Sequence, residues 1–419
     1  MRLIGLLDCN NFFVSCERLF RPDLEHRPVI VLSGNDGCVV ARSNEVKDLG
    51  VPMGVPYFQV RELLQKAQVT IFSSNFTLYR DISRRVMCSL SAVVDTIEPY
   101  SIDEAFFELE VANVVQATAV LTRIKTKIEQ TVGVPVSVGA GMSKTIAKLA
   151  SEKEKRGCGV CVLTGQTWVR ERPLISLSSV WGVGGSLSRK FREQGLYTIG
   201  DLVTADRERV AALFGVVGCR LYDELSQTPV HQVAREHTST QKSIMSTRSF
   251  RVASNDKRVV RDALAHHVQH VAAELRALNL TCQSIQVIAQ PSRHGDWVLE
   301  AGRAESMLPT PTNDTRELLQ QTEFLLETFF NPEVPYKKAG VVVGQLRSLT
   351  MKQPGLFEES KKTEDDRSVM QVFDEINNKY GYKVMSIGQS AAAASWKPAR
   401  DYISPRYTTN WNELVSVRA

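Results

Sequence analysis

The sequence lacks the features that mark membrane and secreted proteins. None of its apolar runs approaches the roughly 18 residues that a membrane-spanning helix requires. Its eight cysteines are scattered over 419 residues, which favours a reducing compartment over a disulfide framework. The first residues, MRLIGLLDCNNFF, carry an acid at Asp8 and no small-residue cleavage site, so we expect no secretory signal. These absences predict a cytoplasmic protein that has no membrane partner.

Extremes of composition are absent as well. Hydrophobic residues make up 43% of the chain and charged residues 23%, a balance that excludes a disordered chain or a coiled coil. The 51 basic and 46 acidic side chains leave a net charge of +5, which only weakly favours an anionic partner. No internal repeat is present, and the length is typical of about three domains.

Strand and helix signals mix in the first 165 residues and predict an α/β or α+β domain. A short buried strand at 3–7 ends at Asp8, and apolar residues spaced by three and four predict a helix over 76–93. A hairpin-like stretch at 94–109 follows. We also expect strands at 28–33, 38–42 and 135–142, helices at 43–49 and around 121–128, and a basic helix at 143–155.

The rest of the chain changes character three times. Residues 166–235 are mostly helical and broken by glycines, and a polar linker follows around 236–241. Residues 242–350 have a β-α-β-β-α-β pattern, with strands at 284–290, 297–303 and 340–346, which predicts a four-stranded sheet with two helices on one face. Beyond 352 the chain is polar, with a short helix near 366–379, and we expect this tail to be partly disordered or ordered by a partner.

Three acids stand out, one at the end of an expected strand and two inside an extended stretch. Asp8 closes the first strand, and Asp103 and Glu104 lie inside the hairpin-like stretch. A buried carboxylate needs compensation, and a hard cation such as Mg²⁺, which prefers oxygen ligands, is one form of it. Since neighbouring residues of a regular strand point to opposite faces, Asp103 and Glu104 can share a site only if the backbone turns or bulges there. From spacing alone, surface or salt-bridged acids are the commoner explanation.

Longer segments around these acids resemble a known family. The segments DCNNFFVSCE (8–17) and YSIDEAF (100–106) are similar to the two signature motifs of Y-family DNA polymerases. The segments NDGCVVAR (35–42), FSSN (72–75) and SPRYTT (404–409) resemble the UmuC-type subgroup, the catalytic subunits of DNA polymerase V. The resemblance covers nearly the whole chain. It implies an α+β multidomain right hand: a palm at 1–165 with fingers inserted at about 21–74, a thumb with a helix–hairpin–helix at 166–235, a little finger at 242–350, and a C-terminal partner-binding tail at 351–419.

The resemblance also implies the chemistry. Asp8, Asp103 and Glu104, together with the backbone carbonyl of Cys9, correspond to the metal ligands, and Asp103 and Glu104 to catalytic residues. Two Mg²⁺ ions are expected, with Mn²⁺ as a possible substitute. The nucleophile would be the primer 3′-hydroxyl, activated by one ion while the other holds the triphosphate of the incoming dNTP.

Five further residues correspond to nucleotide contacts in the family. Phe13 stands where the family places its steric gate, a flat ring that clashes with a 2′-hydroxyl, and Phe12 would pack beside the sugar and base. Both rings are otherwise typical core aromatics. Asn44, Lys47 and Lys148 correspond to residues that contact the triphosphate, although many members carry Tyr and Arg at the first two positions. The alternative for the lysines is a solvated basic surface.

Other segments correspond to contacts with DNA and with proteins. Gly182 and Gly184 would form a hairpin whose backbone approaches a phosphate, and Lys242, Arg248 and Arg251 would grip the duplex from the little finger. The alternative is an ordinary α+β sandwich with a charged edge strand. Gln353, Leu356 and Phe357 resemble the peptide that docks bacterial polymerases on the sliding clamp. By resemblance, a UmuD′-like dimer and RecA are further partners, and the protein is bacterial and associated with the nucleoid when active.

We therefore expect a DNA polymerase that performs error-prone translesion synthesis in the SOS response to DNA damage. Its substrates would be primer–template DNA and dNTPs. A catalytically silent DNA- and clamp-binding subunit, another two-metal palm enzyme such as a nucleotide cyclase, and a helix–hairpin–helix glycosylase remain as alternatives. His266, His267 and His270 on the predicted helix 256–278 are interpreted as a solvated helix face near DNA.

Overall fold

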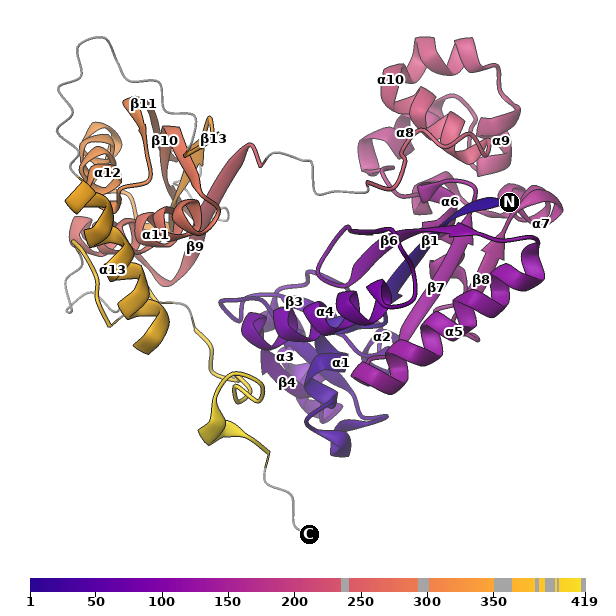
Figure 1. Ribbon diagram of the computed structural model, residues 1–419, viewed down its shortest axis with the longest axis horizontal. Helices are drawn as coiled ribbons and strands as arrows, with labels where there is room; N and C mark the ends of the chain where they lie inside the picture. Colours follow the sequence, from indigo (N-terminus) through magenta and orange to yellow (C-terminus); the bar gives the residue numbers. More distant parts are fainter. Residues whose placement is uncertain are drawn as a thin grey trace. The chain divides into compact units, whose positions relative to one another are not determined.

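Figure 1 shows the computed structural model, which describes residues 1–234, 241–292, 301–349, 364–380, 384–388, 396–397 and 399–415. The chain forms two compact units. The first comprises Met1–Ser33, Gly37–Thr238 and Tyr402–Ala419, and the second comprises Gly34–Asp36 and Ser239–Asp401. Each unit has its own hydrophobic core.

A five-stranded sheet forms the centre of the first unit, with β1 (Arg2–Cys9) in the middle. All of β1 except its first residue is buried, and such a continuous apolar run is typical of a strand covered on both faces. The strand pairs antiparallel with a neighbour on each side. The sheet order is β5 (Ile97–Pro99), β6 (Glu104–Glu110), β1, β7 (Val136–Gly141) and β8 (Val160–Leu163).

Three helices cover the two faces of this sheet. Leu3 and Leu7 of β1 pack in one core with α4 (Phe76–Ser91) and α5 (Val114–Val132), whereas Ile4 and Leu6 pack with α6 (Lys144–Lys153). The alternation follows the period of two in a strand. A Cβ at Gly139 would lie 2.1 Å from the backbone nitrogen of Ser151, so glycine lets α6 lie close to the sheet.

The predicted fingers form a second, smaller layer with its own core. In the three-stranded sheet β2 (Val29–Leu32) lies between β3 (Val39–Arg42) and β4 (Thr70–Ser73). It pairs antiparallel with β3, as the predicted strands at 28–33 and 38–42 require for a hairpin. Two helices complete this region, α2 (Asn44–Asp48) and α3 (Tyr57–Lys66). By contrast, α1 (Phe12–Arg18) and a 3₁₀ turn at Pro22–Leu24 pack in the main core.

The region predicted as the thumb is helical, and its core includes residues of α6 from the region predicted as the palm. Trp168 and Phe191 pack in one cluster with Ile146 and Ala150 of α6. A positive φ of 62° at Gly215 interrupts the last helix, a backbone conformation that glycine adopts without strain. The elements are α7 (Gly165–Glu171), 3₁₀ turns at Arg172–Leu174 and Leu177–Ser179, α8 (Gly185–Glu193), α9 (Ile199–Thr204) and α10 (Arg207–Leu225).

The second unit confirms the predicted β-α-β-β-α-β order. Its sheet has the order β11-β10-β12-β9, and the two helices pack on each other and on the sheet. A short β13 (Arg347–Ser348) pairs with β10. The elements are β9 (Ser243–Ser254), α11 (Lys257–Ala277), β10 (Leu280–Pro291), β11 (Gly302–Thr312), α12 (Thr315–Phe329) and β12 (Tyr336–Gly344).

Two expectations for this unit are wrong. The strand expected at 297–303 is β11, which lies at Gly302–Thr312, and its Pro309 and Pro311 are tolerated because β11 is an edge strand. Residues 293–300 lie outside the described residues. His266 and His267 are not on a solvated face: they are 8% and 2% exposed and pack against Trp396.

The polar tail is divided between the two units. Helix α13 (Glu364–Tyr380) confirms the helix predicted near 366–379, and Arg276 of α11 forms an ion pair of 2.5 Å with Asp374 on it. Trp396 is buried in the core of the second unit, whereas residues 402–415 belong to the first. These segments of the tail are therefore placed within the two units, and its binding to a partner stays a prediction. Within the described ranges no helix is both long and apolar enough to cross a membrane.

Candidate active site

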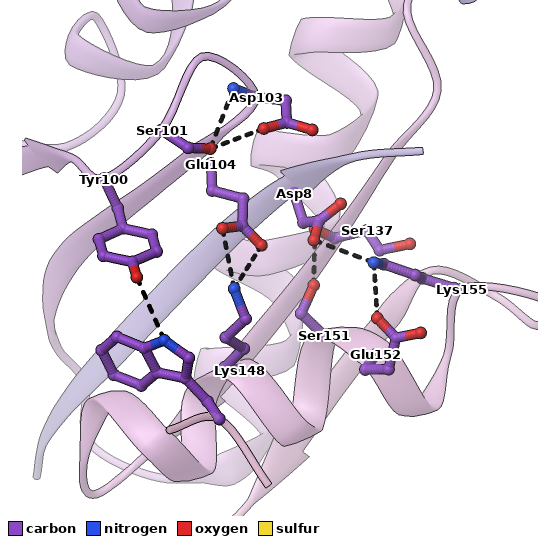
Figure 2. Close-up of polar contacts among 11 residues, drawn as sticks. Asp8, Tyr100, Ser101, Asp103, Glu104, Ser137, Lys148, Ser151, Glu152 and Lys155 are labelled. Carbon is purple, nitrogen blue, oxygen red and sulfur yellow. Dashed lines mark hydrogen bonds and ion pairs between the residues drawn. The ribbon is translucent and has the colours of Figure 1, made fainter. Parts of the chain in front are cut away.

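The three predicted acids come together at one end of the central sheet. Asp8 of β1 lies opposite Glu104 of β6 in the antiparallel register. Asp103 immediately precedes β6, and its carbonyl accepts a hydrogen bond of 2.9 Å from the amide of Cys9. The backbone turns over residues 100–103, where the amides of Tyr100 and Ser101 both donate to the carbonyl of Glu104. The turn that two adjacent acids need in order to share a site is therefore present (Figure 2).

Each acid has a polar partner from the protein (Figure 2). Lys148 Nζ donates to both carboxylate oxygens of Glu104, at 2.7 and 2.8 Å. Lys155 Nζ lies 3.0 Å from Oδ2 of Asp8, and Ser101 Oγ donates to Asp103 Oδ1 at 2.6 Å. Among the residues that the structure describes, no three His, Cys, Asp or Glu side chains are arranged as a ready-made metal cluster.

Burial makes two of these acids, Asp8 and Asp103, costly to ionise. It raises the pKa of Asp8 to about 7, against the opposing effect of Lys155 and with a further increase from neighbouring Glu104. Burial also raises the pKa of Asp103, opposed by the hydrogen bond from Ser101. Carboxylates crowded in a half-buried site are stabilised as anions by a divalent cation, and carboxylate oxygen is the ligand type that Mg²⁺ prefers. The residues present therefore fit a Mg²⁺ site.

Cys9 can offer only its backbone to such a site. Its side chain is 2% exposed in the main core, and burial raises the pKa of the thiol well above its usual range. The thiol is therefore kept neutral, and the carbonyl at the end of β1 is the group left for coordination. Coordination of a metal ion by this carbonyl stays a prediction.

The two aromatic residues of α1 have different environments. Phe12 is 3% exposed and lies in the core, so little of its ring is accessible to a nucleotide. Phe13 is half-buried; its ring stacks on Tyr79 with centroids 4.4 Å apart and meets Phe76 edge-on at 5.9 Å. Phe13 is therefore the more accessible of the two aromatic residues, and its ring is supported by its contacts with Tyr79 and Phe76.

Cations gather beside the acids, and one of them was missed in the sequence. The pKa of Lys47 is lowered by burial and by the neighbouring charges of Lys155 and Arg42. Asn44 begins α2 and accepts a hydrogen bond of 3.1 Å from Asn11. Lys155 follows α6 by two residues, seven positions after Lys148. This spacing of two helical turns is the signal that could have identified it.

An aromatic pair beside Glu104 was also missed. Trp181 Nε1 donates to the hydroxyl of Tyr100 at 3.2 Å, and Lys148 Nζ lies 5.3 Å from the centre of the Tyr100 ring and 5.8 Å from that of Trp181 (Figure 2). A cation over two aromatic faces is held in place. The pair therefore fixes the lysine that binds Glu104.

The remaining predicted residues belong to other segments of the chain. Gly182 has a φ of +87° and Gly184 caps α8, and a Cβ on either would meet nothing within 4 Å. Lys242 is exposed before β9, Arg248 is half-buried on this edge strand, and Arg251 pairs with Asp401 at 3.4 Å. The predicted clamp residues Gln353, Leu356 and Phe357 lie outside the described residues.

Comparison with known proteins identifies the family. The model of the impB/mucB/samB family matches residues 7–152, and the model of its C-terminal domain matches 241–356. Protein ImpB of Salmonella typhimurium is 33% identical over 99% of this chain and 100% of its own length. The chain belongs to the impB/mucB/samB family. Protein UmuC of Salmonella typhimurium is 34% identical over 99% of the chain and 100% of its own length, which confirms the resemblance to the UmuC-type subgroup.

The tail of this chain also matches the model of a domain of unknown function (DUF4113), at residues 367–417.

Solved structures confirm the predicted fold class. A Y-family DNA polymerase chimera, Dbh-Dpo4(243-245)-Dbh, superposes with a TM-score of 0.67 at 18% identity, covering 83% of this chain and 99% of that chain. DinB from Sulfolobus solfataricus superposes with a TM-score of 0.53 at 19% identity, covering 82% and 98%.

Proposed function

We propose that this chain is a Y-family DNA-directed DNA polymerase that performs error-prone translesion synthesis in the SOS response. The observation that carries the proposal is the position of Asp8 opposite Glu104, with Asp103 in the adjoining turn, in a member of the impB/mucB/samB family. Primer–template DNA and dNTPs are its substrates. Extending a primer past a damaged template base is the reaction that the experiment below tests.

Asp8, Asp103 and Glu104, with the carbonyl of Cys9, would hold two Mg²⁺ ions, for which Mn²⁺ is a substitute. When bound, such ions supply Lewis-acid chemistry that makes a hydroxyl more acidic and neutralises a leaving pyrophosphate. Lys148 and Lys155 keep positive charge beside Glu104 and Asp8 and so offset the cost of burying these carboxylates.

The triphosphate of the dNTP is bound by the cations beside the acids. Lys47, Lys148 and Lys155 provide positive charge, and Asn44 provides an amide. Burial, together with the neighbouring charges of Lys155 and Arg42, lowers the pKa of Lys47, and an anion bound beside Lys47 and Lys155 would offset that repulsion. Lys155 is therefore added to the nucleotide contacts expected from the sequence.

Phe13 selects the sugar of the incoming nucleotide. Its ring is packed on Tyr79 and Phe76, so it cannot retreat from a 2′-hydroxyl in that direction without breaking aromatic contacts. Phe12 supports Phe13 from the core, with their ring centroids 5.9 Å apart. Deoxyribose is accepted and ribose is excluded on steric grounds.

DNA and proteins are bound through residues outside this centre. Gly182 and Gly184 leave open space at the hairpin, which lets a phosphate reach the backbone amides. Lys242, Arg248 and Arg251 contact the duplex backbone without reading sequence. Gln353, Leu356 and Phe357 bind the sliding clamp, and a UmuD′-like dimer and RecA complete the active assembly.

Primer extension across an abasic template tests the proposal. The full chain is assayed with Mg²⁺, four dNTPs, the clamp, a UmuD′-like dimer and activated RecA. Wild type should extend past the lesion, and Asp103→Asn should lose about 100-fold or more, the usual scale for a group that acts on the reacting atoms. Exposed Asp95 offers the matched control, since Asp95→Asn makes the same chemical change away from the site.

Two outcomes contradict the proposal. If Asp103→Asn extends primers as well as wild type, the carboxylates are not the catalytic centre. If wild type binds the duplex but extends no primer, the chain is a catalytically silent DNA- and clamp-binding subunit.

A further inference from the structure

The end of the chain packs on the first unit beside α1 and α4. We name residues 402–415 the C-terminal strap. The strap pairs with the end of β4: Ser73 donates its amide to the carbonyl of Tyr402 at 2.9 Å, and the amide of Tyr402 donates to Ser73 Oγ at 3.0 Å. Ile403 forms a parallel bridge with Ser73. The strap therefore extends the sheet of the fingers region.

Two side chains of the strap are anchored next to α1. Tyr407 is 8% exposed and stacks on Phe20, with centroids 4.5 Å apart and an interplanar angle of 6°. Asn75 Nδ2 donates to Ser404 Oγ at 3.0 Å and to the carbonyl of Pro405 at 3.3 Å. The same amide group of Asn75 accepts from the amide of Leu78 and so begins α4.

A buried carboxyl joins the strap to the aromatic residues of the site. Glu17 of α1 is fully buried, and its Oε1 accepts from Tyr79 Oη at 2.7 Å and from Ser404 Oγ at 3.1 Å. Tyr79 in turn stacks on Phe13 with an interplanar angle of 13°. Since no solvent reaches Glu17, a lost hydroxyl cannot be replaced readily by water.

We propose that the C-terminal strap determines sugar selection, because Ser404 holds Glu17 and Tyr79 in the arrangement that positions the Phe13 ring. The proposal deepens the proposed function and rests on it. Ser404, Glu17 and Tyr79 are positioning residues, since they act on the nucleotide through the Phe13 ring. The strap lies within the region that matches a domain of unknown function, and sugar selection gives this part of it a role.

This chain of contacts explains how loss of the Ser404 hydroxyl would affect the Phe13 ring. Removing the Ser404 hydroxyl leaves Glu17 with Tyr79 as its donor, and the carboxyl can move toward the vacated space. The Tyr79 hydroxyl follows its acceptor, and the ring that supports Phe13 tilts with it. The Phe13 ring can then move away from a ribose 2′-hydroxyl, so ribonucleotides are excluded less strongly.

The test compares insertion of a single dNTP and of the matching rNTP by the full assembly. We expect Ser404→Ala and Tyr79→Phe to lower the ratio of kcat/KM for dNTP over rNTP about three- to tenfold, the range of one hydrogen bond. Tyr407→Ala removes the anchor without touching Glu17 and should lower the ratio as well. Thr409→Ala, an exposed position of the same strap, is the control and should leave the ratio unchanged.

The ratio distinguishes positioning from folding. Partial unfolding lowers insertion of both sugars by the same factor, so it leaves the ratio unchanged. Combining Ser404→Ala with Tyr79→Phe should cost no more than either change alone, because both act through Glu17.

Phe13→Ala separates failure of this inference from failure of the proposed function. If Phe13→Ala admits rNTPs while Ser404→Ala and Tyr79→Phe keep the wild-type ratio, the strap has no part in selection and the polymerase proposal stands. If wild type inserts no dNTP, the proposed function fails and the inference falls with it. If wild type inserts dNTP but Phe13→Ala still excludes rNTPs, the gate is wrongly assigned and the inference falls alone.

Discussion

At the scale of single residues, two of the three acids of the site, Asp8 and Glu104, are each paired with a lysine that the fold places beside them. Lys148 lies on a helix that covers the central sheet, and Lys155 lies just beyond the end of the same helix. The two lysines reach different strands, because Glu104 belongs to β6 and Asp8 to β1. Binding of a cation and of a polyphosphate would redistribute these pairs, so acids and lysines function as one charged cluster.

Removal of Lys155 should weaken nucleotide binding more than it weakens the chemical step. In Lys155→Ala we expect kcat/KM for dNTP insertion to fall about tenfold, with most of the loss in KM, since a phosphate contact contributes on this scale. Steady-state insertion kinetics measure both constants. Lys127→Ala, at an exposed position of α5, removes an equal charge away from the site and should have no effect. A loss confined to kcat would contradict a role in triphosphate binding.

Glu17 should make stability depend on pH. Burial raises its pKa from 4.5 to about 7, opposed by hydrogen bonds from Tyr79 and Ser404. The folded state therefore retains a proton that the unfolded state releases, so this contribution is complete below pH 4.5 and is lost as the pH rises to about 7. The shift corresponds to about 3 kcal/mol in the free energy of unfolding.

Urea unfolding of wild type and Glu17→Gln between pH 5 and 8 measures this dependence. The wild-type free energy of unfolding should fall relative to that of Glu17→Gln as the pH rises to 7, and the difference should level off toward pH 8. Parallel curves over the whole range would show that Glu17 titrates normally. Glu25→Gln, an exposed substitution of the same kind, controls for the loss of one acid.

At the scale of elements, regular periods and motifs identified most of the fold. The apolar residues of α4 and the order of elements in the second unit were correctly predicted, because both are local patterns. The predicted bounds of β11 were wrong because proline disfavours strands in general but is tolerated in a strand at the edge of a sheet. The burial of His266 and His267 depends on Trp396, which lies far along the chain and leaves no periodic signal.

The site shows the same division between local and distant information. Asp8, Asp103 and Glu104 were found because they lie in two compact motifs, and the turn at 100–103 confirmed their convergence. The contacts of the strap join residues 329 and 387 positions apart, at Asn75–Ser404 and Glu17–Ser404. Each of these residues is ordinary in its own segment, so only the folded chain shows that they belong together.

The hairpin before α8 gives a prediction that separates binding from folding. Gly184 has an ordinary φ of −80° and open space around its Cβ position, so Gly184→Ala should leave the unfolding temperature unchanged. The added methyl group would stand where a phosphate approaches, and we expect duplex affinity to fall about threefold to tenfold. Fluorescence anisotropy with a duplex measures this. Gly185→Ala, which lies inside α8, controls for the change in helix propensity from glycine to alanine. Equal duplex affinities for wild type, Gly184→Ala and Gly185→Ala would exclude a phosphate contact at Gly184.

At the scale of the whole molecule, the tail contributes to both units. Trp396 fills the core of the second unit beside two buried histidines, while the strap that follows it packs in the first. Trp396 lies outside the β-α-β-β-α-β pattern but packs with α11. We therefore expect the stability of the second unit to depend on this side chain. Truncation near residue 350 would remove this side chain together with α13.

Trp396→Ala should therefore destabilise the second unit selectively. Removing a buried tryptophan typically costs about 3–5 kcal/mol, whereas an exposed one contributes within about 0.5 kcal/mol. Trp396 is 5% exposed and Trp411 is 88% exposed, so Trp411→Ala is a matched control in the same tail. Hydrogen exchange resolves the two units: amides of β10 and β12 should exchange faster in Trp396→Ala, and those of β1 and β7 should not. Equal changes in all four strands would mean that Trp396 supports the first unit as well, and no change in any of them would mean that the second unit is complete without the tail.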